Sequence, residues 1–198
     1  MIKISPIEIT IVVEIKFYSK LTIIALGSLL AVLPDVIPYS SAERFNGTPG
    51  DDNLSGTSEN DRIRGSGGND TLIGLGGNDS IDGGQGNDNL VGSEGDDYLV
   101  GGGRNDTLRG ENGDDEIEGN DGDDELVGEN GTDILTGGLG ADSLNGGEKS
   151  DFLSAGPDDD TLVGGKDADY FACGLGDDEV MDFNASEGDV IFSSCEPI

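Results

Sequence analysis

Apolar residues recur every nine positions along most of this chain. From Asn46 to Val180 the sequence divides into fifteen consecutive nonapeptides, without insertion or deletion. In each unit one apolar side chain, at the ninth position, is expected to point inward while its two neighbours point outward, which predicts a very short strand of about three residues. The fifteen apolar residues are Leu54, Ile63, Leu72, Ile81, Leu90, Leu99, Leu108, Ile117, Leu126, Leu135, Leu144, Leu153, Leu162, Phe171 and Val180.

A single strand of this kind has nothing to pack against, so the units must stack. Two nonapeptide units make one coil, with a strand, a turn, a second strand and a second turn. Coils stacked at the usual strand separation of about 4.8 Å would bring the inward side chains of two facing sheets together as a thin core. The pattern therefore predicts an all-β fold, a parallel β-roll of about fifteen half-turns over residues 46–180.

The turns combine glycine with aspartate. Glycine occupies the second position of thirteen units, with Ala155 and Cys173 as exceptions, and the fifth position of ten. We expect both glycines to permit positive φ and a tight turn with inward carbonyl oxygens. The seventh position is always aspartate, which can fold its carboxylate over the turn, and calcium takes six to eight oxygen ligands in irregular geometry. These aspartates are Asp52, Asp61, Asp70, Asp79, Asp88, Asp97, Asp106, Asp115, Asp124, Asp133, Asp142, Asp151, Asp160, Asp169 and Asp178.

The repeat closely resembles the RTX (repeats-in-toxin, haemolysin-type) nonapeptide G-G-x-G-x-D-x-U-x over residues 46–180. The resemblance implies a calcium-binding β-roll, with each Ca²⁺ between successive turns on one side and the fifteen aspartates as side-chain ligands. Eight turns on one side and seven on the other allow at most thirteen sites, and we expect between six and thirteen ions. Thirteen divalent ions would reduce the formal charge of −32 to about −6, which explains how so acidic a chain could fold.

The nonapeptide pattern becomes less regular near its C-terminal end, and a segment without the pattern follows it. Residues 149–167 lack glycine at three consecutive fifth positions, and there Lys149 and Lys166 could supply positive charge in place of an ion. Residues 181–198 are expected to cap the last coil, and their D-F-N…G-D-x-I segment is similar to the closing segment of serralysin-like proteases. In an exported chain the two cysteines, Cys173 and Cys195, suggest a disulfide, with two free thiols as the alternative.

The first 42 residues suggest export. The apolar run from Leu21 to Leu33 follows Lys20, and Ser40-Ser41-Ala42 offers small residues for cleavage. This fits a signal peptide better than a membrane span, although an uncleaved anchor is the alternative. Either way we expect the repeats to be secreted or attached at the cell surface.

Composition excludes several functions. The chain has 42 acidic and 10 basic residues and no histidine, so nucleic-acid binding, histidine-dependent hydrolysis and imidazole zinc sites are not expected. We expect a non-enzymatic, monomeric protein that folds on calcium binding. The alternative is a calcium-stiffened adhesion protein with a cell-surface or matrix partner. Outward-facing residues for such a surface are Val91, Val100, Val127, Val163, Tyr98, Tyr170 and Phe152, which could equally be ordinary strand formers.

Overall fold

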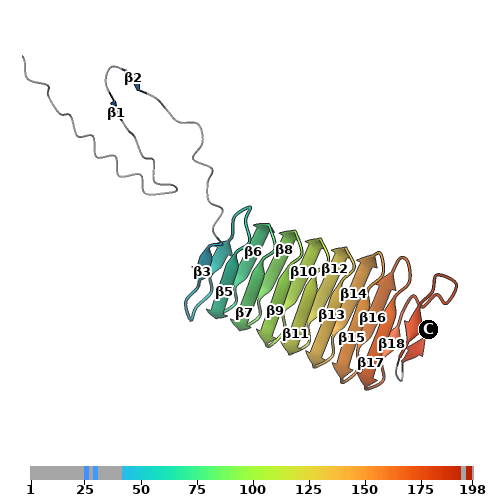
Figure 1. Ribbon diagram of the computed structural model, residues 1–198. Helices are drawn as coiled ribbons and strands as arrows, with labels where there is room; N and C mark the ends of the chain where they lie inside the picture. The colour runs from blue at the N-terminus through green and yellow to red at the C-terminus, as the bar shows by residue number, and fades with distance from the viewer. Residues whose placement is uncertain (1–24, 27–28, 31–41, 193–194, 198) are drawn as a thin grey trace, which may run out of the picture. The chain divides into compact units, whose positions relative to one another are not determined.

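The computed structural model describes residues 25–26, 29–30, 42–192 and 195–197, and every regular element in them is a β-strand (Figure 1). The chain divides into two units, residues 1–40 and 41–198. In the first, β1 (Ala25–Leu26) pairs antiparallel with β2 (Leu29–Leu30). The rest of the predicted signal segment lies outside the described residues, apart from Ala42. No helix in the described ranges is long and apolar enough to cross a bilayer.

The second unit is a parallel β-roll of two nine-stranded sheets, as predicted. Strands alternate between the sheets along the chain (Figure 1). The odd sheet contains β3 (Arg44–Asn46), β5 (Arg62–Gly67), β7 (Ser80–Gln85), β9 (Tyr98–Gly103), β11 (Glu116–Asp121), β13 (Ile134–Leu139), β15 (Phe152–Pro157), β17 (Tyr170–Leu175) and β19 (Val190–Ile191). The even sheet contains β4 (Asn53–Ser55), β6 (Thr71–Gly76), β8 (Asn89–Glu94), β10 (Thr107–Asn112), β12 (Glu125–Asn130), β14 (Ser143–Glu148), β16 (Thr161–Gly165), β18 (Glu179–Val180) and β20 (Glu196–Pro197).

Within the repeats each strand pairs with the strand one coil away, in a register of two repeat units, as Leu108 does with Leu90 and Leu126. Most strands have six residues, so the prediction of about three was too short. In the pairing of β10 with β8, Glu111 still lies opposite Ser93 and Asn112 opposite Glu94. The ladder therefore continues past the second-position glycine, because stacked identical turns keep their backbones in register.

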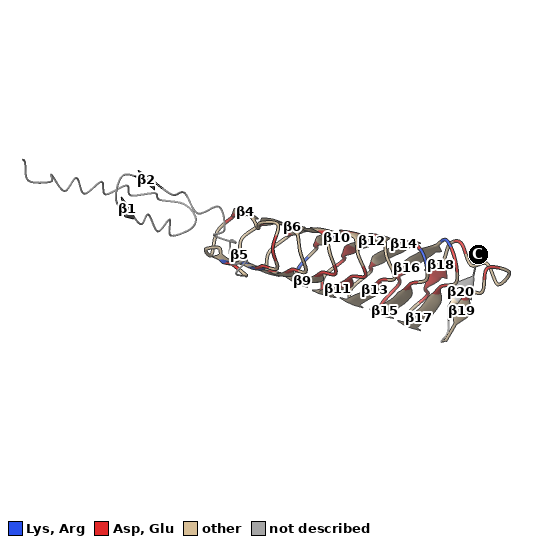
Figure 2. Cartoon of the chain, turned by 45° about the horizontal axis from the view of Figure 1, so that its top comes forward, with Lys and Arg blue, Asp and Glu red and all other residues tan. Residues whose placement is uncertain are grey.

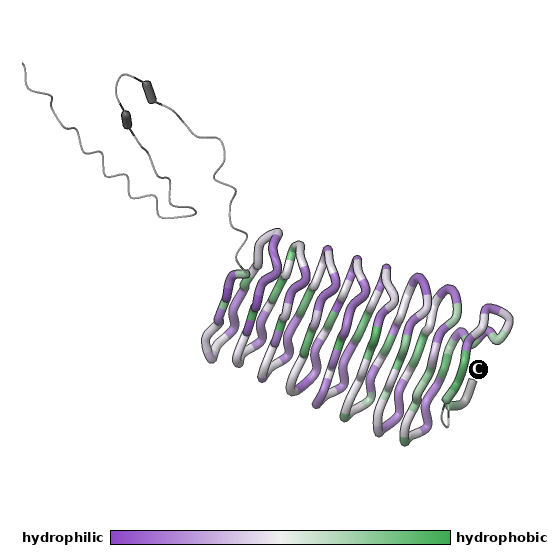
Figure 3. The backbone as a smooth tube through the Cα atoms, in the orientation of Figure 1, coloured by the Kyte–Doolittle hydropathy of each residue, from purple (hydrophilic) through white to green (hydrophobic). Residues whose placement is uncertain are grey.

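Three positions of each unit point inward: the seventh, the ninth and the second. The ninth-position side chains from Ile63 to Val180 are fully buried, whereas Leu54, in the first coil, is only partly buried. Figure 3 shows apolar residues recurring within the strands from coil to coil, with polar residues in both strands and turns. The core is thus a stack of single apolar residues from the two sheets, as the nine-residue period predicts.

Both ends of the roll extend beyond the predicted repeat. At the start of the roll, strand β3 pairs with β5 and places Phe45 next to Ile63. At the end, β19 pairs with β17 and places Ile191 next to Phe171. The segment after the repeats therefore continues both sheets by one strand each. The predicted disulfide is present between Cys173 and Cys195, with a Cα–Cα distance of 5.4 Å, and it joins this segment to β17.

Candidate metal centre

The seventh-position aspartates form two ladders, one at each row of turns. One ladder precedes the even strands and the other precedes the odd strands, and each ladder has a step of two repeat units. All fourteen aspartates from Asp61 to Asp178 are 1–3 % exposed, whereas Asp52, in the first coil, is half-buried. Figure 2 shows acidic residues recurring from coil to coil along the roll.

One carboxylate oxygen of each buried aspartate is used to join neighbouring coils. Oδ1 accepts a hydrogen bond from the backbone N–H of the residue 18 positions earlier, at 2.7–3.1 Å. In the middle of the roll, for example, Oδ1 of Asp124 accepts from the N–H of Asp106 at 2.7 Å. The aspartate is therefore both a structural link between coils and a candidate ligand.

The other oxygen, Oδ2, has no donor in most turns. In thirteen of these aspartates it is buried and accepts no hydrogen bond. An isolated buried carboxylate oxygen is costly, so such a row calls for cations or protons. The thirteen aspartates are Asp70, Asp79, Asp88, Asp97, Asp106, Asp115, Asp124, Asp133, Asp142, Asp151, Asp160, Asp169 and Asp178.

The first aspartate of each ladder differs. Oδ2 of Asp52 accepts from the N–H and Oγ1 of Thr48, at 2.6 and 3.0 Å. Oδ2 of Asp61 accepts from the same two groups of Thr57, at 2.6 and 2.9 Å. Threonine donors thus satisfy Oδ2 of the first aspartate in each ladder. The buried Oδ2 atoms that lack a donor, and so call for a cation, begin at Asp70.

Asp189, in the closing segment and outside the fifteen repeat aspartates, also joins this arrangement. Oδ1 of Asp189 accepts from the N–H of Asp169 at 3.1 Å, so it continues one ladder by another coil. Its Oδ2 accepts from the N–H of Asn184 at 2.7 Å, which closes that ladder with a protein donor. The signal was present in Gly188-Asp189-Val190-Ile191, which repeats the aspartate–x–apolar spacing of the units.

The prediction of positive φ is confirmed for most fifth-position glycines and is wrong for the second-position glycines. Positive φ occurs at the third and fifth positions, as in Ser66 (88°) and Gly68 (105°), whereas no second-position glycine has positive φ. The second position requires glycine for space: a Cβ on Gly128 would lie 2.6 Å from the carbonyl oxygen of Gly146 and would also meet Oδ2 of Asp133. The expectation of left-handed backbone was wrong for this position because that glycine lies within the strand, against the next coil.

Burial changes the acidity of the ladders. Desolvation, with a smaller contribution from neighbouring aspartates and against the lowering effect of the backbone N–H, raises the pKa of Asp97, Asp106, Asp133, Asp142 and Asp151 to about 7. The same causes raise the pKa of Asp79, Asp115, Asp160 and Asp169 to about 6. Without metal, the folded roll therefore binds protons near neutral pH.

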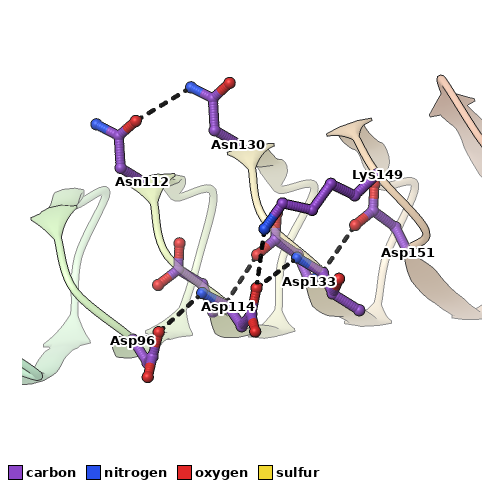
Figure 4. A network of polar contacts seen from close by, with 9 residues as sticks. Asp96, Asn112, Asp114, Asn130, Asp133, Lys149 and Asp151 are labelled. Atoms are coloured by element: carbon purple, nitrogen blue, oxygen red, sulfur yellow. Dashed lines mark hydrogen bonds and ion pairs between the residues drawn. The ribbon is translucent and has the colours of Figure 1, made fainter.

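The irregular stretch from 149 to 167 keeps the same turn geometry. Lys149, Asp158 and Asp167 replace the fifth-position glycine and have φ values of 74°, 86° and 73°. The ammonium of Lys149 lies 3.4 Å from Oδ1 of Asp114, and Figure 4 shows its side chain reaching across the turn that holds Asp133. Its charge opposes the burial-driven rise in the pKa of Asp133. Lys149 thus lies where the sequence suggested a substitute cation, whereas Lys166 pairs with Glu148.

A second, exposed row of polar residues lies at the sixth position, where the repeat pattern alone predicted no role. Oδ1 of Asp96 accepts from the N–H of Asp114 at 3.0 Å, and Oδ1 of Asp114 accepts from the N–H of Thr132 at 2.9 Å (Figure 4). The Thr132 N–H and the Lys149 ammonium lower the pKa of Asp114. This outer row links coils and adds negative charge beside the ladders.

The buried aspartates suit calcium better than a metal held by side chains alone. In the described part of the chain, no three His, Cys, Asp or Glu side chains are grouped closely enough to hold a metal. A cation at a turn would need main-chain carbonyl oxygens in addition to the aspartate, and calcium accepts that mixed oxygen set. The structure thus supports the donor chemistry, and each predicted ligand from Asp70 to Asp178 has an oxygen to offer.

Comparison with known proteins identifies the repeat. The model of the RTX calcium-binding nonapeptide repeat matches in overlapping segments that together cover residues 46–180. A search of curated proteins found no significant match. The family match covers more than half of the chain and coincides with the aspartate ladders. This chain belongs to the RTX calcium-binding nonapeptide repeat family.

Proposed function

We propose that this protein is an extracellular, non-catalytic calcium-binding protein whose roll folds when Ca²⁺ enters the turns. The observation that carries the proposal is the row of thirteen buried Oδ2 atoms without hydrogen-bond donors. Six to thirteen ions would neutralise them, and the thirteen aspartates from Asp70 to Asp178 would supply the side-chain ligands. An ion that binds only the folded chain stabilises it by mass action.

The aspartates and glycines of the turns have different roles in calcium binding and in the packing of the coils. The aspartates bring charge and one free oxygen, while their Oδ1 atoms hold successive coils in place. Second-position glycines let the next coil approach closely. When bound, calcium supplies the positive charge that these carboxylates lack. Because the apolar core is one residue thick in each strand, it is too thin to offset the repulsion of so many buried acids.

A calcium titration tests the proposal. Circular dichroism and hydrodynamic radius are measured on calcium-free protein and at increasing Ca²⁺, with isothermal titration calorimetry for the number of ions. We expect a largely disordered, expanded chain without calcium at pH 8, and a compact β-rich one in millimolar calcium. Magnesium at the same concentration is the control, since it prefers rigid octahedral sites. An identical spectrum with and without calcium would refute the proposal.

Extracellular location is supported by the disulfide between Cys173 and Cys195 and by the apolar segment at residues 21–33. Absence of catalysis is supported by the uniformity of the buried acids, because acid–base catalysis needs carboxyls in different environments. Incubation with panels of ester, peptide and glycoside substrates in calcium tests this part, and calcium-dependent turnover of any of them would contradict it.

A second candidate function, adhesion by a calcium-stiffened surface, has one observation in its favour. Ile134, Phe152 and Tyr170 lie side by side on the outer face of the odd sheet, each 38–47 % exposed, and Tyr170 stacks on Phe192. The seven outward residues suggested by sequence divide between the sheets: Val100, Tyr98, Tyr170 and Phe152 are on the odd sheet, and Val91, Val127 and Val163 on the even sheet. Calcium-dependent retention on cells that is lost in Phe152→Ser/Tyr170→Ser would favour adhesion.

A further inference from the structure

The outer face of the odd sheet has a hollow of about 510 Å³ near the start of the roll. Its lining includes Arg44, Arg62, Arg64, Ser80, Asp82 and Tyr98, from strands β3, β5, β7 and β9. The described part of the chain contains seven Lys and Arg residues, and three of them meet here. This hollow is therefore a basic site on an acidic protein.

Its arginines differ in their partners. Arg64 donates from Nε and Nη2 to Oδ2 of Asp82, at 2.9 and 2.7 Å, and is held against the sheet. The exposed side chains of Arg44 and Arg62 make no hydrogen bond or ion pair with any other described residue. They lie directly opposite each other in the pairing of β3 with β5. Like charges in such a cross-strand pair destabilise the sheet unless an anion neutralises them.

The surroundings limit the size of that anion. On the far side of Tyr98, the next strand places Glu116 and Glu118 beside Tyr98 and Val100. The basic site thus extends over three strand steps, about 14 Å, and an extended polyanion would meet these acids. Tyr98 is 37 % exposed and offers a ring face, and Ser80 lies between it and Arg62 in the same row.

We propose that this hollow binds a small ligand that carries two oxyanion groups on a ring. One group pairs with Arg44 and the other with Arg62, whose strands are about 4.8 Å apart. The ring lies against Tyr98. The site is separate from the calcium ladders, because it uses outward-facing side chains of the odd sheet.

Binding is tested on calcium-loaded protein with two rigid probes, benzene-1,3-dicarboxylate and benzene-1,3-disulfonate, followed by NMR or calorimetry. The two probes distinguish a carboxylate from a sulfur oxyanion as the preferred group. We expect millimolar or tighter binding of at least one probe, weaker binding of benzoate, and a decline with added sodium chloride. The neutral benzene-1,3-dicarboxamide should not bind.

Matched variants locate the site. Arg44→Gln/Arg62→Gln should weaken binding by about tenfold or more, as expected for two lost charge-assisted contacts, and Tyr98→Val should weaken it less. Arg104→Gln is the control, because Arg104 is an exposed cation in a turn outside the hollow. Circular dichroism in calcium establishes that every variant is folded. Absence of binding by the folded wild type, or an equal loss in Arg104→Gln, would overturn the proposal.

Discussion

At the scale of the residue, the seventh-position aspartate has two separate tasks. Its Oδ1 accepts a backbone N–H from the preceding coil, and its Oδ2 is left buried without a donor. Asparagine at this position could keep the first contact but would remove the negative charge. Substitution therefore separates the structural role of the side chain from its role toward calcium.

Asp124→Asn should lower calcium binding without unfolding the calcium-loaded roll. Because each proposed ion would lie between successive turns, loss of one ligand should affect about one or two ions. Calorimetry gives the stoichiometry, and the calcium midpoint of folding should move to higher concentration. Asp123→Asn is the matched control, because it makes the same charge change at an exposed neighbour. Equal effects of both variants would show that total charge, and not the buried oxygen, governs binding.

The second-position glycine has a steric task. Gly128→Ala should destabilise the calcium-loaded roll by about 1–3 kcal/mol, because the new methyl group overpacks the space between Asp133 and the next coil. Urea unfolding in calcium measures the change. The control is Glu125→Ala, an outward position of the same strand β12. The natural Ala155 shows that the roll can absorb one such methyl group, so a moderate effect is expected, and a neutral one would contradict the steric explanation.

At the scale of the element, the strands depend on their neighbours and not on their own length. Interior strands are bonded on both sides by strands one coil away, whereas β19 and β20 are terminal and contain two residues each. Asp182 supports this end by accepting from the N–H groups of Gly164 and Gly165, at 3.0 and 2.8 Å. The disulfide adds a covalent link across 22 residues.

Cys173→Ala/Cys195→Ala should lower the free energy of unfolding by about 3 kcal/mol, from the lost restriction of the unfolded chain. Alanine is suitable because Ala155 already occupies the same repeat position as Cys173. Hydrogen exchange in calcium should show faster opening of residues 181–192, with little change in the middle of the roll. Wild-type protein kept reduced should behave like the variant. Unchanged exchange at this end would show that the strands alone hold it.

At the scale of the whole molecule, either calcium ions or protons can neutralise the negative charge of the buried aspartates. The raised pKa values mean that the metal-free roll takes up protons on folding. Unfolded aspartates titrate near pH 4. The contribution of these groups to the stability of the metal-free roll is therefore complete below about pH 4 and is lost as the pH rises through 6 to 7.

Calcium-free protein should consequently gain β-structure when the pH falls from 8 to 5. Circular dichroism and hydrodynamic radius at these two values provide the test. The calcium-loaded protein is the reference, and its fold should depend much less on pH over the same range. A metal-free chain that is equally expanded at pH 5 and pH 8 would contradict the effect of burial on these aspartates.

The nine-residue period was sufficient for the fold and for the inward placement of the seventh-position aspartates. It determines which side chains face inward, so the apolar stack, the coil of two units and the two rows of aspartate could all be predicted. The disulfide also followed, because only two cysteines exist. These features depend on the local order of residues, which is the same in every unit.

Only the tertiary structure decided what each atom contacts. Hydrogen-bond partners come from the next coil, two repeat units away, and the local pattern does not specify them. That is why Asp189 joins a ladder from outside the repeat and why glycine at the second position serves close packing, whereas Asp52 and Asp61 take their Oδ2 donors from a threonine four residues earlier in the same unit. The unpaired Arg44 and Arg62 likewise became neighbours through stacking. The sequence alone determined the repeating unit, and contact between units determined which oxygens and cations were left unsatisfied.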